Sequence, residues 1–174
     1  MKYLLLFLSA FLLFTSCKKN ESRTKVFQSE ISSKINELYK LDKSNNRYSP
    51  PKNLFSPELE KLLNKSTEIT AADTEKIKKS DHPTDMPLML VSYLMTNLQD
   101  TDTGFKIKKI NVNGDNAEAF TEFYYENDPK LTQKIKISLL NEDGWKIKNI
   151  MYNKDSNLKS TLENFIQFSR ENSQ

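Results

Sequence analysis

The sequence contains one cysteine, three glycines and one histidine among 174 residues, and each shortage excludes some chemistry. A single cysteine, Cys17, excludes a disulfide within the chain. Loops that cradle phosphates need clustered glycines, whereas Gly104, Gly114 and Gly144 stand far apart, each in a turn-like context. His82 would have to serve any histidine-dependent catalysis without a second imidazole. A packed core must therefore supply the stability of the fold.

The chain also has only a small excess of positive over negative charge. The 26 lysines and arginines against 23 acidic residues leave a net charge of +3 at pH 7. Proteins that bind nucleic acids concentrate positive charge on one face, but here Lys106 and Lys108 are followed by Glu118 and Glu122. We therefore expect a solvated surface of mixed charge and no nucleic-acid partner.

The start of the chain is its most informative segment. Residues 3–14 are apolar apart from one serine; Met1-Lys2 precede them, and Thr15-Ser16 lead to Cys17 and a polar stretch. A charged start, an apolar core and a small-residue cleavage site form the pattern of a secretory signal. As a helix the apolar run would rise only about 18 Å, too little to span a hydrocarbon core of about 30 Å. We expect residues 1–16 to be removed on export.

The tract Leu12-Leu13-Phe14-Thr15-Ser16-Cys17 resembles the lipobox of bacterial lipoproteins, with phenylalanine where leucine is usual. The resemblance implies cleavage after Ser16, a diacylglycerol on Cys17, an acyl group such as palmitate on the new N-terminus, and a lipidated tether over residues 17–24. Two or more acyl chains hold a protein on a membrane stably, whereas one does so only marginally. The alternative is an ordinary secretory signal with Cys17 just beyond the cleavage site.

This anchor predicts an exported protein of the cell envelope, attached to a membrane through Cys17. Lys18 follows the cysteine, where enteric bacteria use aspartate to retain lipoproteins in the inner membrane. By that analogy, we expect attachment to the outer membrane, facing the periplasm.

Residues 25–172 are expected to form a single α+β domain that begins with helices. Apolar residues recur at three- and four-residue steps over Lys25 to Lys43, which predicts a long amphipathic helix. Ser56-Pro57-Glu58 predicts the start of a second helix, because serine caps free amides, proline suits the first position and an acid favours the helix start. Thr70, with an acid three residues on, predicts a short third helix. Residues 81–103 have no periodicity that distinguishes a buried helix from an extended segment.

From Phe105 onward the apolar residues alternate with period two, which predicts a curved antiparallel meander of about four strands. The alternation slips in phase between Ile107 and Ile110, which indicates a β-bulge. The strands are expected at Phe105–Val112, Ala117–Glu126, around Ile135–Leu139 and from Trp145 to Tyr152, with turns at 113–115, 127–129 and 141–144. A C-terminal helix, capped by Ser156 or Asn157, is predicted from the apolar stripe of Leu158, Leu162, Phe165 and Ile166.

Two segments carry a family resemblance. One is Phe105 to Tyr124, with Val112-Asn113-Gly114-Asp115-Asn116-Ala117 at its hairpin, and the other is Glu142-Asp143-Gly144-Trp145-Lys146-Ile147-Lys148-Asn149-Ile150. They resemble the Gly-Asp hairpin and the terminal Gly-Trp strand of cone-shaped domains similar to nuclear transport factor 2. With Ser56-Pro57-Glu58-Leu59 and the Asp81 to Pro87 segment, the chain is similar to domain-of-unknown-function family 3828, a group of exported, often lipid-anchored bacterial proteins.

This resemblance covers most of residues 25–152. It implies a curved sheet packed by helices, with a pocket at the wide end of the cone; the extra C-terminal helix departs from the plainest cone. Some members of the family are described as immunity proteins against toxins delivered into the periplasm. The family supplies no catalytic residues.

Candidate catalytic groups are few. The tract Asp81-His82-Pro83-Thr84-Asp85 gathers one imidazole and two carboxylates, but such proline-flanked loops are more often exposed turns, so no metal site is predicted. Glu118, Glu122 and Glu126 repeat on one strand face, which is typical of a face open to water or complementary to a basic partner. Without a nucleophile and a positioned base, no catalytic residue and no cofactor is predicted.

Aromatic residues concentrate on the last strands and usually fill a core. If the cone encloses a pocket, a ligand or partner is expected near Tyr93, Phe123, Tyr124, Tyr125, Trp145 and Tyr152. Three functions stay open at this point. The first is a non-catalytic envelope lipoprotein that binds a protein or a small ligand, the second an immunity protein that neutralises a secreted toxin, and the third a small enzyme that uses the cone pocket.

Overall fold

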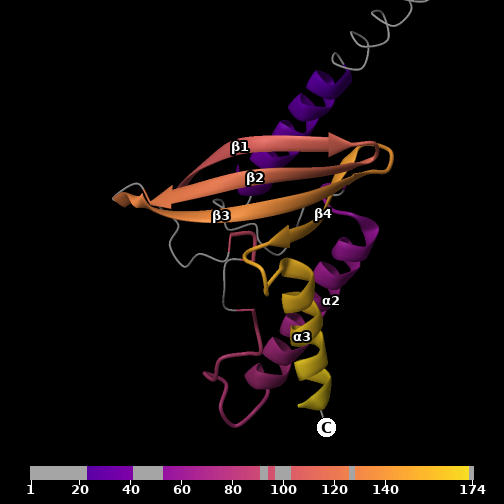
Figure 1. Cartoon of the computed structure of the whole chain (residues 1–174). Coiled ribbons are helices and arrows are strands. Elements are labelled where there is room, and N and C mark those ends of the chain that lie inside the picture. Colours follow the sequence, from indigo (N-terminus) through magenta and orange to yellow (C-terminus); the bar gives the residue numbers. More distant parts are fainter. Residues whose placement is uncertain (1–22, 41–52, 91–93, 97–102, 126–127, 173–174) are drawn as a thin grey trace, which may run out of the picture.

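The structure is a computed structural model that describes residues 23–40, 53–90, 94–96, 103–125 and 128–172 (Figure 1). A helix over residues 23–40, here called the N-terminal helix, comes first. The further elements, in order, are α2 (Pro57–Lys78), β1 (Thr103–Asn113), β2 (Asn116–Tyr125), β3 (Asp128–Asn141), β4 (Trp145–Met151) and α3 (Leu158–Glu171). This order confirms the predicted α+β class, with helices before and after an antiparallel sheet.

The expected signal peptide and the lipidated Cys17 lie outside the described residues. Residues 23 and 24, which the sequence assigns to the tether, are helical and belong to the N-terminal helix. None of the helices in the described part of the chain has the length and apolar character that a membrane span requires.

The four strands form one antiparallel sheet in the order β1-β2-β3-β4, a simple meander. Asn113 pairs with Asn116 at the first hairpin, where Gly114 adopts a φ of +59° that L-residues with a Cβ rarely take. The pairing of β1 with β2 shifts register between Ile107 and Lys109. The bulge predicted from the phase slip is therefore confirmed.

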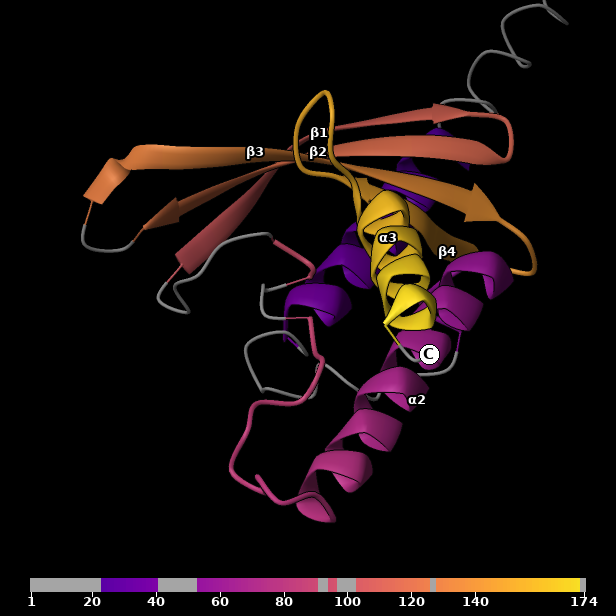
Figure 2. The same ribbon diagram turned by 90° about the horizontal axis from the view of Figure 1, so that it is seen from below.

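One face of the sheet carries the core. Figure 1 shows the N-terminal helix crossing behind the sheet, and Figure 2 shows it on one side of the sheet only, with α2 and α3 side by side near β4. This inner face buries residues of β2, β3 and β4, as on β3, where Ile135, Ile137 and Leu139 are buried, whereas the apolar residues of β1 are partly buried. The intervening Lys134 and Lys136 point to the other face, here called the outer face, as the alternation predicts.

The N-terminal helix supplies much of the core. Its buried residues are Ile31, Ile35, Leu38 and Tyr39. The Tyr39 ring lies 4.8 Å from the Phe105 ring and 4.7 Å from the Phe123 ring, measured between centroids. Near the start of the helix, the Phe27 ring meets the Trp145 ring edge-on at 5.5 Å. Burying each large apolar side chain of this kind contributes about 1.5–3 kcal/mol, so the predicted helix is an integral part of the fold.

The predicted start of α2 is confirmed, because Ser56 caps the helix and proline occupies its first turn. The separate third helix predicted at Thr70 is wrong, since α2 continues without a break for 22 residues to Lys78. No glycine or later proline interrupts that stretch. Asp73, whose carboxylate was expected to help cap a new helix, instead accepts a hydrogen bond from the backbone N–H of Leu88 at 2.6 Å and holds the returning chain.

The C-terminal helix α3 begins as predicted at the cap Asn157, which forms a capping box with Ser160. Its predicted apolar stripe is buried. The edge of β4 that does not pair with β3 is covered by Phe55, which forms a short parallel bridge to Ile147. There the N–H of Ser56 donates to the carbonyl of Ile147 at 2.8 Å, and the N–H of Ile147 donates to the carbonyl of Leu54 at 2.9 Å.

Candidate functional site

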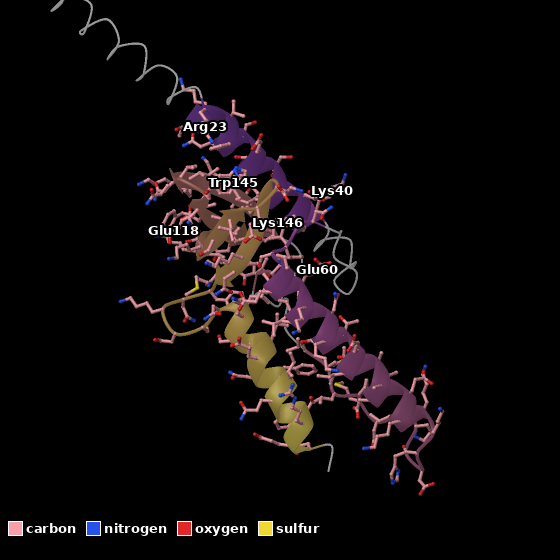
Figure 3. All side chains as sticks on the ribbon, turned by 90° about the vertical axis from the view of Figure 1, so that its right-hand side faces the viewer. Arg23, Lys40, Glu60, Glu118, Trp145 and Lys146 are labelled. Carbon is pink, nitrogen blue, oxygen red and sulfur yellow. The ribbon has the colours of Figure 1, made fainter. Side chains whose placement is uncertain are left out.

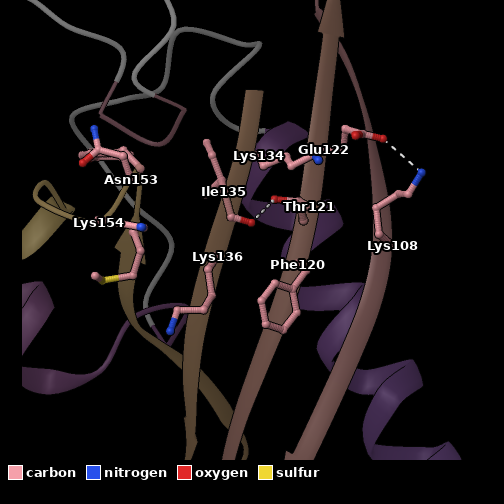
Figure 4. Close-up of a pocket in the computed structure, with 11 residues that line it drawn as sticks. Lys108, Phe120, Thr121, Glu122, Lys134, Ile135, Lys136, Asn153 and Lys154 are labelled. Atoms are coloured by element: carbon pink, nitrogen blue, oxygen red, sulfur yellow. Dashed lines mark hydrogen bonds and ion pairs between the residues drawn. The ribbon is translucent and has the colours of Figure 1, made fainter. Parts of the chain in front are cut away.

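A groove of about 790 Å³ opens on the outer face of the sheet (Figure 4). Volumes in this range are typical of sites for small molecules, which run from about 300 to 1,000 Å³. The groove is lined by 11 residues of the four strands and the turn after β4: Lys108, Phe120, Thr121, Glu122, Lys134, Ile135, Lys136, Met151, Tyr152, Asn153 and Lys154.

The groove exists because β4 is much shorter than its neighbour. β3 has 14 residues and β4 only seven, and their pairing ends where Lys136 meets Met151. Beyond that point the remainder of β3 has no strand beside it on the β4 side among the described residues. Gln133 spans the opening there, because its side-chain amide donates to the carbonyl of Tyr152 at 3.1 Å.

The turn between β4 and α3 forms one wall of the groove. The side-chain oxygen of Asn153 accepts the backbone N–H groups of Asp155 and Ser156 at 2.8 and 2.9 Å, the pattern of an Asx turn. The N–H of Tyr152 donates to the carbonyl of Ser156 at 3.0 Å and closes the turn. Figure 2 shows this turn projecting beyond the sheet on the side away from the N-terminal helix, and Figure 4 shows Lys154 at the groove.

Apolar side chains form the floor of the groove. Phe120 and Met151 lie half-buried on the outer face, both beside Lys136 in the strand pairing. Beneath them the hydroxyl of Thr121 donates to the carbonyl of Ile135 at 3.2 Å, which satisfies two buried polar atoms between β2 and β3.

The charges around the groove are unequal, because four of its lining residues are lysines and only one is an acid. Lys108, the bulge residue of β1, pairs with Glu122 at 3.0 Å. Lys136 pairs at 2.8 Å with Glu118, which lies outside the lining. No ion pair neutralises the other two lysines of the groove within the described residues, so the site has a surplus of positive charge.

The structure does not bring the predicted aromatic residues together. Phe123 and Trp145 are each only 2 % exposed and belong to the core, because the N-terminal helix covers the inner face that they occupy. Tyr124 is on the outer face with 37 % of its surface exposed. Tyr125 is half-buried at the end of β2, and Tyr93 lies outside the described residues.

Among the described residues of that set, only Tyr152 lines the groove, and its hydroxyl donates to the carbonyl of Leu94. Sequence reasoning therefore missed the groove lysines. The alternation of Lys134 and Lys136 indicated a face exposed to water, but their placement in one groove with Lys154 depends on the tertiary structure.

The other candidate groups lie elsewhere. The Asp81 to Asp85 segment is an exposed turn, in which the N–H of Asp85 donates to the carbonyl of His82 at 3.1 Å. In the described ranges, no three His, Cys, Asp or Glu side chains gather as metal ligands. Glu118 and Glu122 pair with lysines of the same sheet, which supports the interpretation of a face open to water; Glu126 lies outside the described residues.

A second groove of about 870 Å³ lies between α2 and α3. Acids and bases alternate along it; an example is the pair of Lys65 and Glu68 at 3.2 Å. At its edge Lys159 donates to Glu58 at 2.5 Å, and this hydrogen bond together with the charge of Lys159 lowers the pKa of the Glu58 carboxyl. The near balance of charge gives this groove no preference for a ligand of either sign.

Comparisons with known proteins return no match to this chain among family models, curated proteins or solved structures. The resemblance to family 3828 and to the cone-shaped domains therefore stays a prediction. The basis for a functional assignment is the sequence pattern and the geometry of the groove.

Proposed function

We propose that this chain is a lipid-anchored protein of the bacterial cell envelope whose folded part binds a ligand and catalyses no reaction. The lipobox-like tract ending at Cys17 supports the anchor. The observation that carries the binding role is the groove on the outer face, where an apolar floor lies beside lysines in surplus over acids. Its one acidic lining residue, Glu122, is engaged by Lys108, which speaks against a role for that carboxylate in acid–base chemistry.

The proposal includes a cone-like domain similar to nuclear transport factor 2, in the manner of family 3828. A long helix before a four-stranded meander, the Gly114 hairpin and the Trp145 strand support it. On the inner face the rings of Tyr39, Phe105 and Phe123 pack together. Because those rings occupy the space between helix and sheet, we place ligand binding on the outer face instead.

Neutralisation of a secreted toxin is the second candidate function. The exposed turn after α2 favours it, because Asp81 and Asp85 present two carboxylates to solvent in a protruding loop. Deleting the gene would then sensitise cells to a toxin, and the double change Asp81→Asn with Asp85→Asn would abolish protection. Full protection by that variant would refute this role for the loop.

The anchor is tested by the intact mass of the full chain after expression in a bacterium with two membranes. We expect a mature chain that begins at Cys17 and carries acyl groups. A Cys17→Ser variant should leave the membrane fraction. A mature form that starts elsewhere, or that lacks acyl groups, would refute the anchor.

The binding role is tested by native mass spectrometry of the purified full chain. Ligand adducts are expected on the native protein and should be lost when Met151→Trp fills the groove. Met86→Trp is the matched control, because Met86 is 75 % exposed and lies outside the groove lining. Adducts that survive Met151→Trp would show that the ligand binds elsewhere.

A further inference from the structure

We propose that the groove on the outer face selects an anionic amphiphile, a small molecule with a negatively charged head and an apolar tail. This inference rests on the proposed function and names the class of ligand for the same site. Two features of the groove carry it: two lysines that form no ion pair within the described part of the chain, and an apolar floor beside them.

The anionic head follows from the pairing of the lysines. Lys108 and Lys136 each have a carboxylate within 3.0 Å. Lys134 and Lys154 have no ion-pair partner among the described residues, although both line the groove. An anion bound in the groove would give these ammonium groups a charged partner, and charge-assisted hydrogen bonds are about twice as strong as neutral ones. A carboxylate and a phosphate monoester share this chemistry.

The apolar tail follows from the floor. Phe120 and Met151 lie half-buried on the face of the sheet that the described helices leave open, so their exposed parts are accessible to water. Covering such side chains is favourable by about 25 cal/mol per Å², and methionine adapts to tails of different shape. An inorganic anion would leave the apolar floor exposed to water, and a neutral apolar molecule would give Lys134 and Lys154 no charged partner.

The wall that carries Lys154 is already formed. The two hydrogen bonds to the Asn153 side chain fix the turn after β4, while β3 carries Lys134 as part of the sheet. Lys134 lies on β3 and Lys154 in the turn after β4, and both line the groove (Figure 4). The conformational entropy lost on binding is therefore mainly that of the lysine side chains and of the ligand.

The test uses the full exported chain in phosphatidylcholine nanodiscs, with ¹³C-labelled methionine methyl groups observed by NMR. Met151 reports on the groove, and Met86, which is exposed outside it, is an internal control. The probes are octanoate, octyl phosphate, 1-octanol and inorganic phosphate. We expect the two anionic amphiphiles to shift the Met151 signal in a saturable way and to bind at least about tenfold more tightly than 1-octanol or inorganic phosphate.

Lysine variants test the head. The double change Lys134→Gln with Lys154→Gln is expected to weaken octanoate binding about tenfold and to leave 1-octanol binding unchanged. Lys40→Gln with Lys61→Gln is the matched control, because both of these lysines are exposed and outside the groove. It should leave all four affinities unchanged.

The inference of an anionic amphiphile would be overturned if octanoate and 1-octanol bound with equal affinity, or if the Lys134/Lys154 and Lys40/Lys61 double variants lost equal octanoate affinity. Either result would still leave a binding groove in place. A Met151 signal that responds to inorganic phosphate as strongly as to octyl phosphate would show a simple anion site and would also overturn the inference. If instead the native protein forms no ligand adducts in mass spectrometry, or forms adducts that persist in the Met151→Trp variant, the proposed binding in this groove itself fails. The two failures are therefore distinguishable.

Discussion

Shortening a core residue of the N-terminal helix should destabilise the whole fold. Ile35 is fully buried in the same cluster as the sheet residues Ile137 and Ile147. Ile35→Ala removes most of that side chain and leaves a cavity between the helix and the sheet. Asn36→Ala, one position further along, changes an exposed residue to the same alanine and is the matched control.

The magnitude follows from complete burial. Replacing a buried isoleucine by alanine costs about 2–5 kcal/mol, and the better helix propensity of alanine returns less than about 0.7 kcal/mol. We therefore expect Ile35→Ala to lower the free energy of unfolding by about 3 kcal/mol. In a domain of this size that corresponds to a melting temperature lower by about 6–12 °C. Asn36→Ala should stay within about 0.5 kcal/mol of the native protein.

The assay is urea unfolding of the full chain in mild detergent, followed by tryptophan fluorescence. Trp145 is the single tryptophan of the sequence, and its ring contacts Phe27 of the N-terminal helix. Its emission therefore reports on the docking of that helix as well as on the sheet. The slope of the unfolding free energy against urea should be unchanged, because the same surface is exposed on unfolding.

A loss below about 1 kcal/mol for Ile35→Ala, or a loss equal to that of Asn36→Ala, would refute this account of the core. It would mean that the N-terminal helix docks weakly and that strands and later helices fold without it. The proposal of an integral helix on the inner face, and with it the placement of binding on the outer face, would then fail.

Three further changes test the local structure. Gly144→Ala should cost about 1–3 kcal/mol in unfolding free energy, because φ at Gly144 is +108° and side chains with a Cβ are strained there. Tyr152→Phe should cost about 1–2 kcal/mol, since a backbone carbonyl loses its donor, whereas Tyr124→Phe on the exposed ring should have no measurable effect. Lys159→Met should reduce stability at pH 7 but not at pH 2. The lowered pKa of Glu58 makes its stabilisation complete above the ordinary value of 4.5 and lost as the pH falls through the lower folded value; pH-independent loss in a thermal melt would contradict that.

The elements with strong periodicity were predictable from the sequence. The N-terminal helix and β3 each bury one face, so the 3.6-residue and two-residue periods were both readable. The bulge near Lys108 could also be predicted, because a single extra residue moves the apolar residues Ile107 and Ile110 out of phase with each other.

The extent of α2 could not be predicted in the same way. After Leu63 the helix buries few apolar residues, so its periodicity fades and local cap signals dominated the prediction. In the structure Thr70 lies within the helix, where its carbonyl accepts the hydroxyl of Thr74 at 2.7 Å. A cap-like residue in a stretch without glycine or proline can continue a helix when nothing stops it.

The site was less predictable than the fold, because it depends on where strands end relative to one another. Sequence alternation identified Lys134 and Lys136 as solvent-facing, and aromatic content pointed to Phe123 and Trp145. The aromatic residues became core because the N-terminal helix covers their face. The groove arose on the opposite face, where no apolar periodicity marks it.

The groove is a product of irregularities in an otherwise simple meander. A sheet of four equal strands would present a flat outer face, whose alternating lysines and acids would pair across neighbouring strands. Here the bulge inserts Lys108 and the early end of β4 opens the side of β3, while the Asx turn at Asn153 raises a wall beside the opening. β-Bulges are over-represented next to active sites, where they redirect a side chain or end the strand pairing. The proposed ligand binding rests on the coincidence of these three features around one apolar floor, because the inner face already meets the needs of the fold.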